Sequence, residues 1–309
     1  MPGLKAMIPL DGSKLSESAL TMLPFLKSLG FGELRLVSVW EENWEDVASG
    51  KEDELAAAGE RGQAYLDAYL KERAETATAA GFTVETVVKV GEAADEVLEQ
   101  TSDGIDLALI ATHGRTGLRR WRLGSVADRL SRETPCPDLI IGPNVEVDLD
   151  TFSVKRVVVA LDGSELSEEA LPVAAWIADK TGASLDLIRA VSLTPMAMDP
   201  SLGVYPVDLI TSVEDAAKEY LARHAQTLQD GGKRTVTASI LLGSPGEQLV
   251  EYLEKDPPSL VIMATRGHSG LARLDLGSVT DQVLHGPSPV LVIRPEEEKA
   301  SRLVAEAKK

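Results

Sequence analysis

The sequence predicts an α/β fold made of two tandem, doubly wound parallel sheets of five strands each, arranged as a pseudo-symmetric pair. Three observations lead to this prediction. The 309-residue chain contains the same sequence blocks twice, each copy alternates short β-rich runs with longer amphipathic helical runs, and glycine- and serine-rich stretches directly follow the strands. A chain of this length is long enough for two domains of ordinary size.

The duplication is visible in four blocks that recur in the same order. Residues 8–20 read IPLDGSKLSESAL, and residues 159–171 read VALDGSELSEEAL. The later blocks are GEAADEVLEQ at 91 with GEQLVEYLEK at 246, ATHGRTGLRRWRLGSVADRL at 111 with ATRGHSGLARLDLGSVTDQV at 264, and TPCPDLIIGP at 134 with GPSPVLVIRP at 286. A repeated order of this kind indicates two copies of one structural unit. We assign unit one to residues 1–147, unit two to residues 154–296 and a charged C-terminal tail to residues 297–309.

Strand and helix patterns alternate within each unit. The strand candidates are residues 4–10, 34–40, 83–90, 105–112 and 138–142 in unit one, and 155–161, 184–191, 235–242, 259–265 and 289–294 in unit two. Amphipathic helix candidates in unit one are residues 15–29, 51–80, 92–101 and 125–132. Near-continuous apolar strands are typical of parallel sheets covered on both faces. The β-α-β alternation implies right-handed crossovers, and such sheets bind ligands at the carboxyl ends of their strands, at the switch in strand order.

Composition excludes several classes of protein. The net charge of −18 argues against general binding to nucleic acid or to an anionic membrane, because a phosphate surface would repel the chain. No run approaches the ~18 apolar residues of a membrane span, and MPGLKAMIPLDGS lacks the pattern of a signal peptide. The single cysteine, Cys136, excludes an intramolecular disulfide framework and fits a reducing compartment. We therefore expect a cytoplasmic protein.

One loop of unit one concentrates positive charge in this acidic chain. Residues 112–125 read THGRTGLRRWRLGS and contain Arg115, Arg119, Arg120 and Arg122 but no carboxylate. The loop follows a predicted strand and leads into a helix that starts near Ser125. Backbone N–H groups, the Ser125 hydroxyl and a helix N-terminus together can form a cradle for an anion, and the arginines can add charge-assisted contacts to phosphate. The alternative is a solvated basic patch, which isolated charge runs usually are.

These residues resemble the universal stress protein family. Gly114, nine residues and then Gly124-Ser125 match the later part of its nucleotide motif, G-x2-G-x9-G-[S/T], and Gly267, nine residues and Gly277-Ser278 match it again. Both units also have the family's aspartate after the first strand. The resemblance covers nearly the whole chain and implies a Rossmann-like sheet of the adenine nucleotide alpha hydrolase type. The first glycine of the motif is replaced by alanine in both units, at Ala111 and Ala264.

The resemblance also implies a site for ATP, with or without Mg²⁺, in each unit. Asp11 and Asp162 would face the ribose and the adenine, and the backbones of Val39 and Val191 would bind adenine. The phosphates would lie on the two glycine loops. The residues implied in unit one are Pro9, Leu10, Asp11, Val39, Ala111, His113, Gly114, Arg115, Gly117, Gly124, Ser125 and Val126. Those in unit two are Ala160, Leu161, Asp162, Val191, Ala264, Arg266, Gly267, His268, Gly270, Gly277, Ser278 and Val279.

Some of these residues have a plainer interpretation. Asp-Gly-Ser after a strand is also a good turn and helix cap, so each aspartate has a structural alternative. His113 and His268 can be ordinary surface histidines. The sequence contains no Walker lysine, no G-x-G-x-x-G after a strand, no G-x-S-x-G elbow and no metal-ligand spacing of histidine and cysteine. We therefore expect neither a catalytic residue nor a resident metal.

Three functions remain open from the sequence: a nucleotide-dependent regulatory protein of the stress-response type, a slow ATP hydrolase, and an interaction module with vestigial pockets. We favour the first, as a binding protein rather than an enzyme. The resemblance implies that units pair through the edge strand after the T-P-x-P element, so residues 138–142 and 289–294 are the expected contact between units. The sequence leaves open a further homodimer, the stress signal and the protein partner.

Overall fold

The computed structural model describes residues 3–41, 52–102, 104–112, 123–145, 152–192, 207–265, 277–294 and 302–308. Each predicted strand is present within a few residues of its expected bounds. The strands of unit one are β1 (Leu4–Pro9), β2 (Phe31–Trp40), β3 (Thr83–Val90), β4 (Leu107–Ala111) and β5 (Asp138–Ile141). Those of unit two are β6 (Arg156–Leu161), β7 (Ser184–Val191), β8 (Val236–Leu242), β9 (Leu260–Ala264) and β10 (Val290–Ile293).

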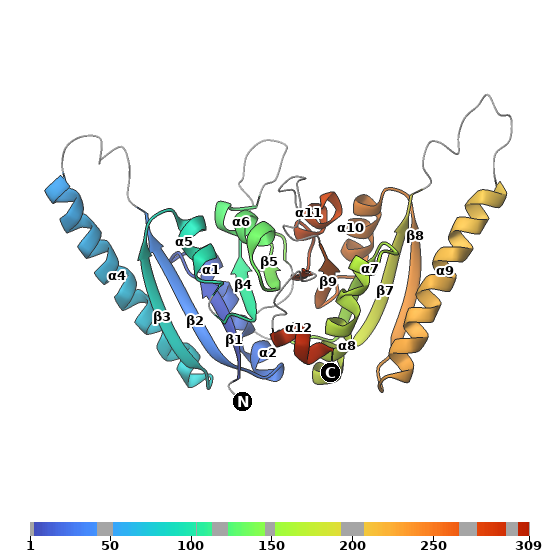
Figure 1. Cartoon of the computed structure of the whole chain (residues 1–309), viewed down its shortest axis with the longest axis horizontal. Helices are drawn as coiled ribbons and strands as arrows, with labels where there is room; N and C mark the ends of the chain where they lie inside the picture. The colour runs from blue at the N-terminus through green and yellow to red at the C-terminus, as the bar shows by residue number, and fades with distance from the viewer. Residues whose placement is uncertain are drawn as a thin grey trace, which may run out of the picture.

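The strands form one ten-stranded sheet in the order β3-β2-β1-β4-β5-β10-β9-β6-β7-β8 (Figure 1). Neighbouring strands are parallel within each unit. The junction between β5 and β10 is antiparallel, and we call this junction the seam. The predicted pair of doubly wound five-stranded sheets is confirmed, as are the two strands expected to join them. The strand order switches between β1 and β4 in unit one, and between β6 and β9 in unit two.

Helices cover both faces of the sheet (Figure 1). In unit one they are α1 (Lys14–Ser18), η1 (Ala19–Met22), α2 (Leu23–Ser28), α4 (Glu52–Ala79), α5 (Ala93–Glu99) and α6 (Ser125–Glu133). In unit two and the tail they are α7 (Glu165–Glu168), α8 (Ala170–Thr181), α9 (Val207–Asp230), α10 (Pro245–Lys255), α11 (Ser278–Leu284) and α12 (Arg302–Ala307). The helix predicted over 15–29 is broken into α1, η1 and α2. Pro24 has no N–H for the helical ladder there, and Ser18 and Thr21 donate to backbone carbonyls.

Two hydrophobic cores lie on opposite faces of the sheet, because successive strand residues point to opposite sides. On one face, Ile8 and Leu109 pack with residues of α2, α4, α8 and α9. On the other, Met7 and Ile110 pack with residues of α5, α6, α10 and α11. Both cores contain residues from both units, so the sheet and its packing are continuous across the seam.

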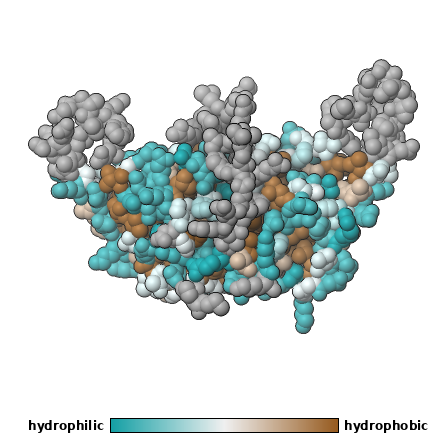
Figure 2. Space-filling model, in the orientation of Figure 1, coloured by the Kyte–Doolittle hydropathy of each residue, from teal (hydrophilic) through white to brown (hydrophobic). Residues whose placement is uncertain are grey.

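The seam is buried, whereas the outer strands β3 and β8 carry exposed residues. All residues of β5 and β10 are buried. Figure 2 shows a largely hydrophilic surface whose apolar areas include both flanks of the molecule. In the part of the chain that the structure describes, the large exposed hydrophobic side chains are Tyr65 on α4, Val213 on α9 and Leu242 on β8. Duplication has therefore covered the two apolar inner edges with each other.

The C-terminal tail contains a helix that the sequence analysis did not predict. α12 lies between the two units at the end of the sheet where the chain begins (Figure 1). Its Leu303 and Val304 are buried in the core that α8 contributes to. Arg302 forms an ion pair of 2.7 Å with Asp106 of unit one, and Lys308 forms one of 2.6 Å with Glu169 of unit two. α12 therefore holds both units at once.

The seam contains a buried carboxylate whose ionisation should affect stability. Burial raises the pKa of Asp138 to about 6 from the ordinary value of 3.8, and the adjacent Arg294 offsets only part of this effect. Because the folded state then binds this proton more tightly than the unfolded state, the contribution of Asp138 to stability is greatest below pH 3.8 and is lost as the pH rises through about 6.

We expect Asp138→Asn to remove this dependence. Between about pH 3.5 and pH 7, wild type should lose roughly 3 kcal/mol of unfolding free energy relative to the variant. Urea denaturation of both proteins across this range measures the difference. A difference that does not vary with pH would contradict the raised pKa.

Candidate functional site

A pocket of about 210 Å³ lies at the carboxyl ends of β1, β2 and β4, at the switch in strand order of unit one. All of the residues predicted for unit one that the structure describes line this pocket: Pro9, Leu10, Asp11, Val39, Ala111, Gly124, Ser125 and Val126. His113, Gly114, Arg115 and Gly117 lie outside the described residues, as do Arg119, Arg120 and Arg122. Thr112, which precedes residues 113–122, and Gly124, which follows them, both line the pocket.

Seven further residues line the pocket and were missed from the sequence: Ser16, Val37, Ala93, Val97, Ile110, Thr112 and Ala127. Two signals could have indicated several of them. Val37 lies two residues before Val39 on β2, so its side chain points to the same face of the sheet. Ala93 and Val97 belong to the repeated block that begins at Gly91. The alternation of side chains along β2 and the second repeated block therefore both indicated pocket residues that the glycine motif itself does not supply.

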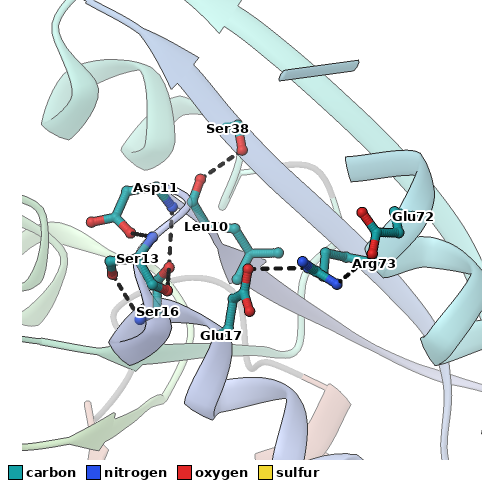
Figure 3. A network of polar contacts seen from close by, with 8 residues as sticks. All are labelled: Leu10, Asp11, Ser13, Ser16, Glu17, Ser38, Glu72 and Arg73. Atoms are coloured by element: carbon teal, nitrogen blue, oxygen red, sulfur yellow. Dashed lines mark hydrogen bonds and ion pairs between the residues drawn. The ribbon is translucent and has the colours of Figure 1, made fainter. Parts of the chain in front are cut away.

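The Asp-Gly-Ser turn after β1 combines a structural role with an exposed carboxylate (Figure 3). Asp11 Oδ1 accepts a hydrogen bond of 2.9 Å from the backbone N–H of Ser13, and Ser13 rather than Asp11 caps α1 by accepting from Ser16 N. Gly12 has a φ of +80°, a conformation that favours glycine. Part of the structural alternative is therefore correct, because the carboxylate stabilises the turn that starts the helix.

Asp11 is nevertheless available to a ligand. The side chain is exposed and lines the pocket. Partial burial acts to raise its pKa, but hydrogen bonds from Ser13 and Ser16 outweigh this effect, so the pKa of Asp11 lies below the ordinary value of 3.8. The carboxylate is thus an anion at neutral pH. It can accept hydrogen bonds from hydroxyl groups and would repel a phosphate.

The turn is fixed to the rest of unit one by two buried or partly buried contacts (Figure 3). The Ser38 hydroxyl on β2 donates to the carbonyl of Leu10 at 2.6 Å. Glu17 on α1 forms an ion pair of 3.1 Å with Arg73 on α4. These contacts hold the end of β1 and the start of α1, so the position of Asp11 is set by two neighbouring elements.

The phosphate side of the predicted site is the N-terminus of α6. The N-cap residue is Gly124, and no side chain caps the helix. The first N–H groups of a helix have no intrahelical partner, and the helix dipole favours an anion there. Gly124 has a φ of −56°, so glycine is not needed for a left-handed conformation. A Cβ here would lie 3.1 Å from Oγ1 of Thr112, which is closer than ordinary packing, and this Oγ1 accepts a hydrogen bond from Gly124 N.

Unit two repeats the described half of this arrangement. Ser164 N donates to Asp162 Oδ1 at 2.9 Å, as Ser13 N does to Asp11. The pKa of Asp162 is also lowered, because hydrogen bonds from Ser164 and Ser167 outweigh the effect of burial. Gly277 caps α11 without a side-chain contact. Ala160, Leu161, Ala264, Ser278 and Val279 occupy the corresponding strand ends and helix start, whereas Arg266, Gly267, His268 and Gly270 lie outside the described residues.

The pairing of Val39 with Val191 was wrong by one residue. Val37 lies opposite Pro9 and Ile188 lies opposite Ala160, so the strand register makes Ala190 the counterpart of Val39. Val191 corresponds to Trp40: their carbonyls accept hydrogen bonds from Gly243 and Gly91 respectively. Since side chains alternate along a strand, Val191 points to the face opposite that of Val39.

The remaining chemistry of the described residues is limited. Within these ranges, no group of three or more histidine, cysteine, aspartate or glutamate side chains could hold a metal ion. Cys136 is buried, and burial raises the pKa of its thiol to about 12, as expected of an inert core thiol. None of the helices that the structure describes is long and apolar enough to cross a membrane.

The chain is similar in sequence to known proteins. The sequence profile of the universal stress protein family matches residues 4–142 and 153–294. A universal stress protein of Methanocaldococcus jannaschii is 33% identical over 142 residues, which are 45% of this chain and 82% of that protein. One from Mycobacterium bovis is 29% identical over 197 residues, which are 63% of this chain and 64% of that protein.

A solved structure supports the fold of the whole chain. The crystal structure of a universal stress protein from Archaeoglobus fulgidus is 21% identical, with a TM-score of 0.68, and the match covers 94% of this chain and 98% of that one. The family profile matches most of each unit, and the predicted doubly wound sheets and the predicted contact between their edge strands are present in the structure. The chain therefore belongs to the universal stress protein family, as a tandem protein of two family units.

Proposed function

We propose that this protein is a regulatory protein of the stress-response type that binds ATP at the carboxyl edge of its sheet. The observation that carries the proposal is the unit-one pocket, which combines three environments in one place. Val37, Val39, Val97 and Ile110 give an apolar wall suited to a purine ring. Asp11 offers an ionised acceptor suited to ribose hydroxyls, and the uncapped start of α6 offers N–H donors suited to phosphate.

The size of the pocket sets how ATP would lie. Its volume of about 210 Å³ is below the ~300–1,000 Å³ of typical small-molecule sites. A nucleotide whose base and ribose fill it would therefore extend past Gly124, the N-cap residue of α6. The orientation follows from charge, because Asp11 repels phosphate and the N-terminus of α6 attracts it.

No specific observation favours hydrolysis over binding. Asp11 is the only carboxylate that lines the described pocket. Asp128, in the first turn of α6, forms an ion pair of 2.7 Å with Arg132. In our proposal the bound nucleotide acts by shifting the population of one conformation or assembly of the protein.

Thermal unfolding of the full chain with and without Mg-ATP tests the proposal. A ligand at a hundred times its Kd stabilises the folded state by about 2.7 kcal/mol, so the unfolding temperature should rise by several degrees. Mass spectrometry of nucleotide released from freshly purified protein is the second measurement. Absence of both the shift and a bound nucleotide would favour an interaction module with vestigial pockets. Phosphate release over many turnovers that is lost in Asp11→Asn would favour a hydrolase.

The two units should differ in affinity. Aligned from Gly114 and Gly267, the loop of unit one has four arginines where unit two has His268, Ala272, Arg273 and Asp275. Each charge near a triphosphate contributes on the order of 1 kcal/mol when it is screened by solvent. We expect unit one to bind ATP about tenfold or more tightly than unit two, and with the stronger salt dependence.

Calorimetric titration of two blocked variants measures this difference. Gly124→Glu leaves only the unit-two site, and Gly277→Glu leaves only the unit-one site. A Cβ at 124 already lies 3.1 Å from Oγ1 of Thr112, so Gly124→Ala is the control for crowding without charge. Equal affinity and equal salt dependence of the two glutamate variants would show that the arginines do not serve the nucleotide.

A further inference from the structure

The seam joins two copies of the same sequence block, yet its two ends differ. Leu139 lies opposite Leu291, Asp138 opposite Val292 and Ile140 opposite Val290. Each unit therefore presents the same edge to the other, as in a two-fold symmetric dimer. In the repeated blocks, however, Asp138 corresponds to Val290, and Gly142 corresponds to Arg294. The substitutions place charge at one end of the seam and no charge at the other.

The charged end is fully enclosed. Asp138 is 0% exposed, and Arg294 of unit two donates to its Oδ2. The same guanidinium donates to the unit-one carbonyls of Cys136, at 2.9 Å, and Leu130, at 3.1 Å. Removing one partner of such a buried pair leaves an uncompensated charge and costs several kcal/mol. Each of these two residues therefore requires the other.

The opposite end excludes a side chain at the corresponding position. A Cβ added to Gly142 would lie 2.3 Å from the carbonyl oxygen of Leu284, at the end of α11. This oxygen belongs to the backbone of a helix, so it cannot move aside as a flexible side chain can. The arginine found at the charged end could not be placed here.

These features disfavour pairing between like units in the same register. Two copies of unit one would bury two Asp138 carboxylates with Gly142 where Arg294 now lies, so neither carboxylate would meet a cation. Two copies of unit two would place Arg294 where Gly142 now lies, against the Leu284 carbonyl, with Val290 in place of the carboxylate. In both arrangements the apolar strands would pair as before, but a buried charge would have no partner of opposite sign.

We propose that Asp138 and Arg294 select the partner of each unit. The β5 edge of unit one pairs with a β10 edge that carries this arginine, from the same chain or from a second copy of it. It does not pair with the β5 edge of another unit one. The apolar strands supply most of the buried surface, but they are nearly the same in both units and cannot distinguish them. Within the seam, the charged pair provides the distinction, as a buried polar residue does when it fixes the register of a coiled coil.

Subunit exchange after cleavage tests the proposal. A protease site is placed between β5 and β6 of the full-length chain, which is folded intact and then cleaved. The two fragments are exchanged in mild urea and returned to buffer, and native mass spectrometry counts the three kinds of pair. We expect mixed pairs of units one and two to exceed the statistical share by at least about tenfold. In Asp138→Val with Arg294→Gly, the two edges carry the same residues at these two positions. We expect the excess of mixed pairs to fall by about tenfold relative to wild type, because α12 contributes equally to pairing in both proteins.

Two further variants complete the design. Asp138→Asn keeps the shape of the side chain but removes the charge that opposes pairing of two copies of unit one, so that homotypic pair should appear even if the double variant fails to fold. Glu251→Gln with Lys255→Met removes an exposed ion pair on α10 and should leave wild-type pairing unchanged. Statistical pairing in the wild type, or an excess of mixed pairs in both Asp138 variants equal to that of the wild type, would overturn the proposal.

Discussion

Arg294→Ala is expected to lower the free energy of unfolding by about 3 to 5 kcal/mol, because it leaves the Asp138 carboxyl buried without its cation. The side chain of Arg294 is 7% exposed, and that of Asp138 is 0% exposed. Without the guanidinium, Asp138 must either remain ionised in an apolar seam or take up a proton. The carbonyls of Leu130 and Cys136 also lose their donor. Urea denaturation at neutral pH measures the loss.

The double variant Asp138→Asn with Arg294→Met is the matched control for this effect. It removes both charges and keeps similar volumes, and replacing a whole buried ion pair by neutral residues is often close to neutral for stability. We therefore expect the double variant to be clearly more stable than Arg294→Ala. If the two variants lose the same stability, packing of the arginine stem rather than the unpaired charge explains the loss.

Removal of α12, by ending the chain after residue 301, should lower the free energy of unfolding by on the order of 2 to 4 kcal/mol. Leu303 and Val304 are buried, and burial of such a side chain contributes about 1.5 to 3 kcal/mol. Arg302 donates to both carboxylate oxygens of Asp106, through Nε at 3.0 Å and through a terminal nitrogen at 2.7 Å. The entropy of ordering a helix of six residues offsets part of these gains.

Lys308→Ala provides the comparison for this truncation. Its ion pair with Glu169 is largely exposed, so the variant should lose less than about 1 kcal/mol. Leu303→Ala should account for a large part of the truncation. If the truncated chain unfolds at the same urea concentration as the full chain, α12 does not stabilise the two units.

The local pattern of the sequence was sufficient for most of the fold. Near-continuous apolar runs fixed the ten strands, and the repeated blocks fixed the division into two units, because each unit must bury its own sheet faces. The position of the described half of the candidate site followed as well. Asp11, Ala111 and Ser125 each lie directly after a strand or at the start of a helix, and a parallel sheet brings such positions to one edge.

The tertiary structure alone decided the features that depend on partners distant in the sequence. Nothing local to Asp138 shows that it is neutralised by Arg294, and nothing in the charged tail shows that Arg302 lies against Asp106. The position of Val191 was also misjudged, because a strand's end does not reveal its register with its neighbour. Sequence periodicity reports which face of an element is buried. Which residue lies opposite another is set by packing between elements, and here that packing decides how the two units are joined.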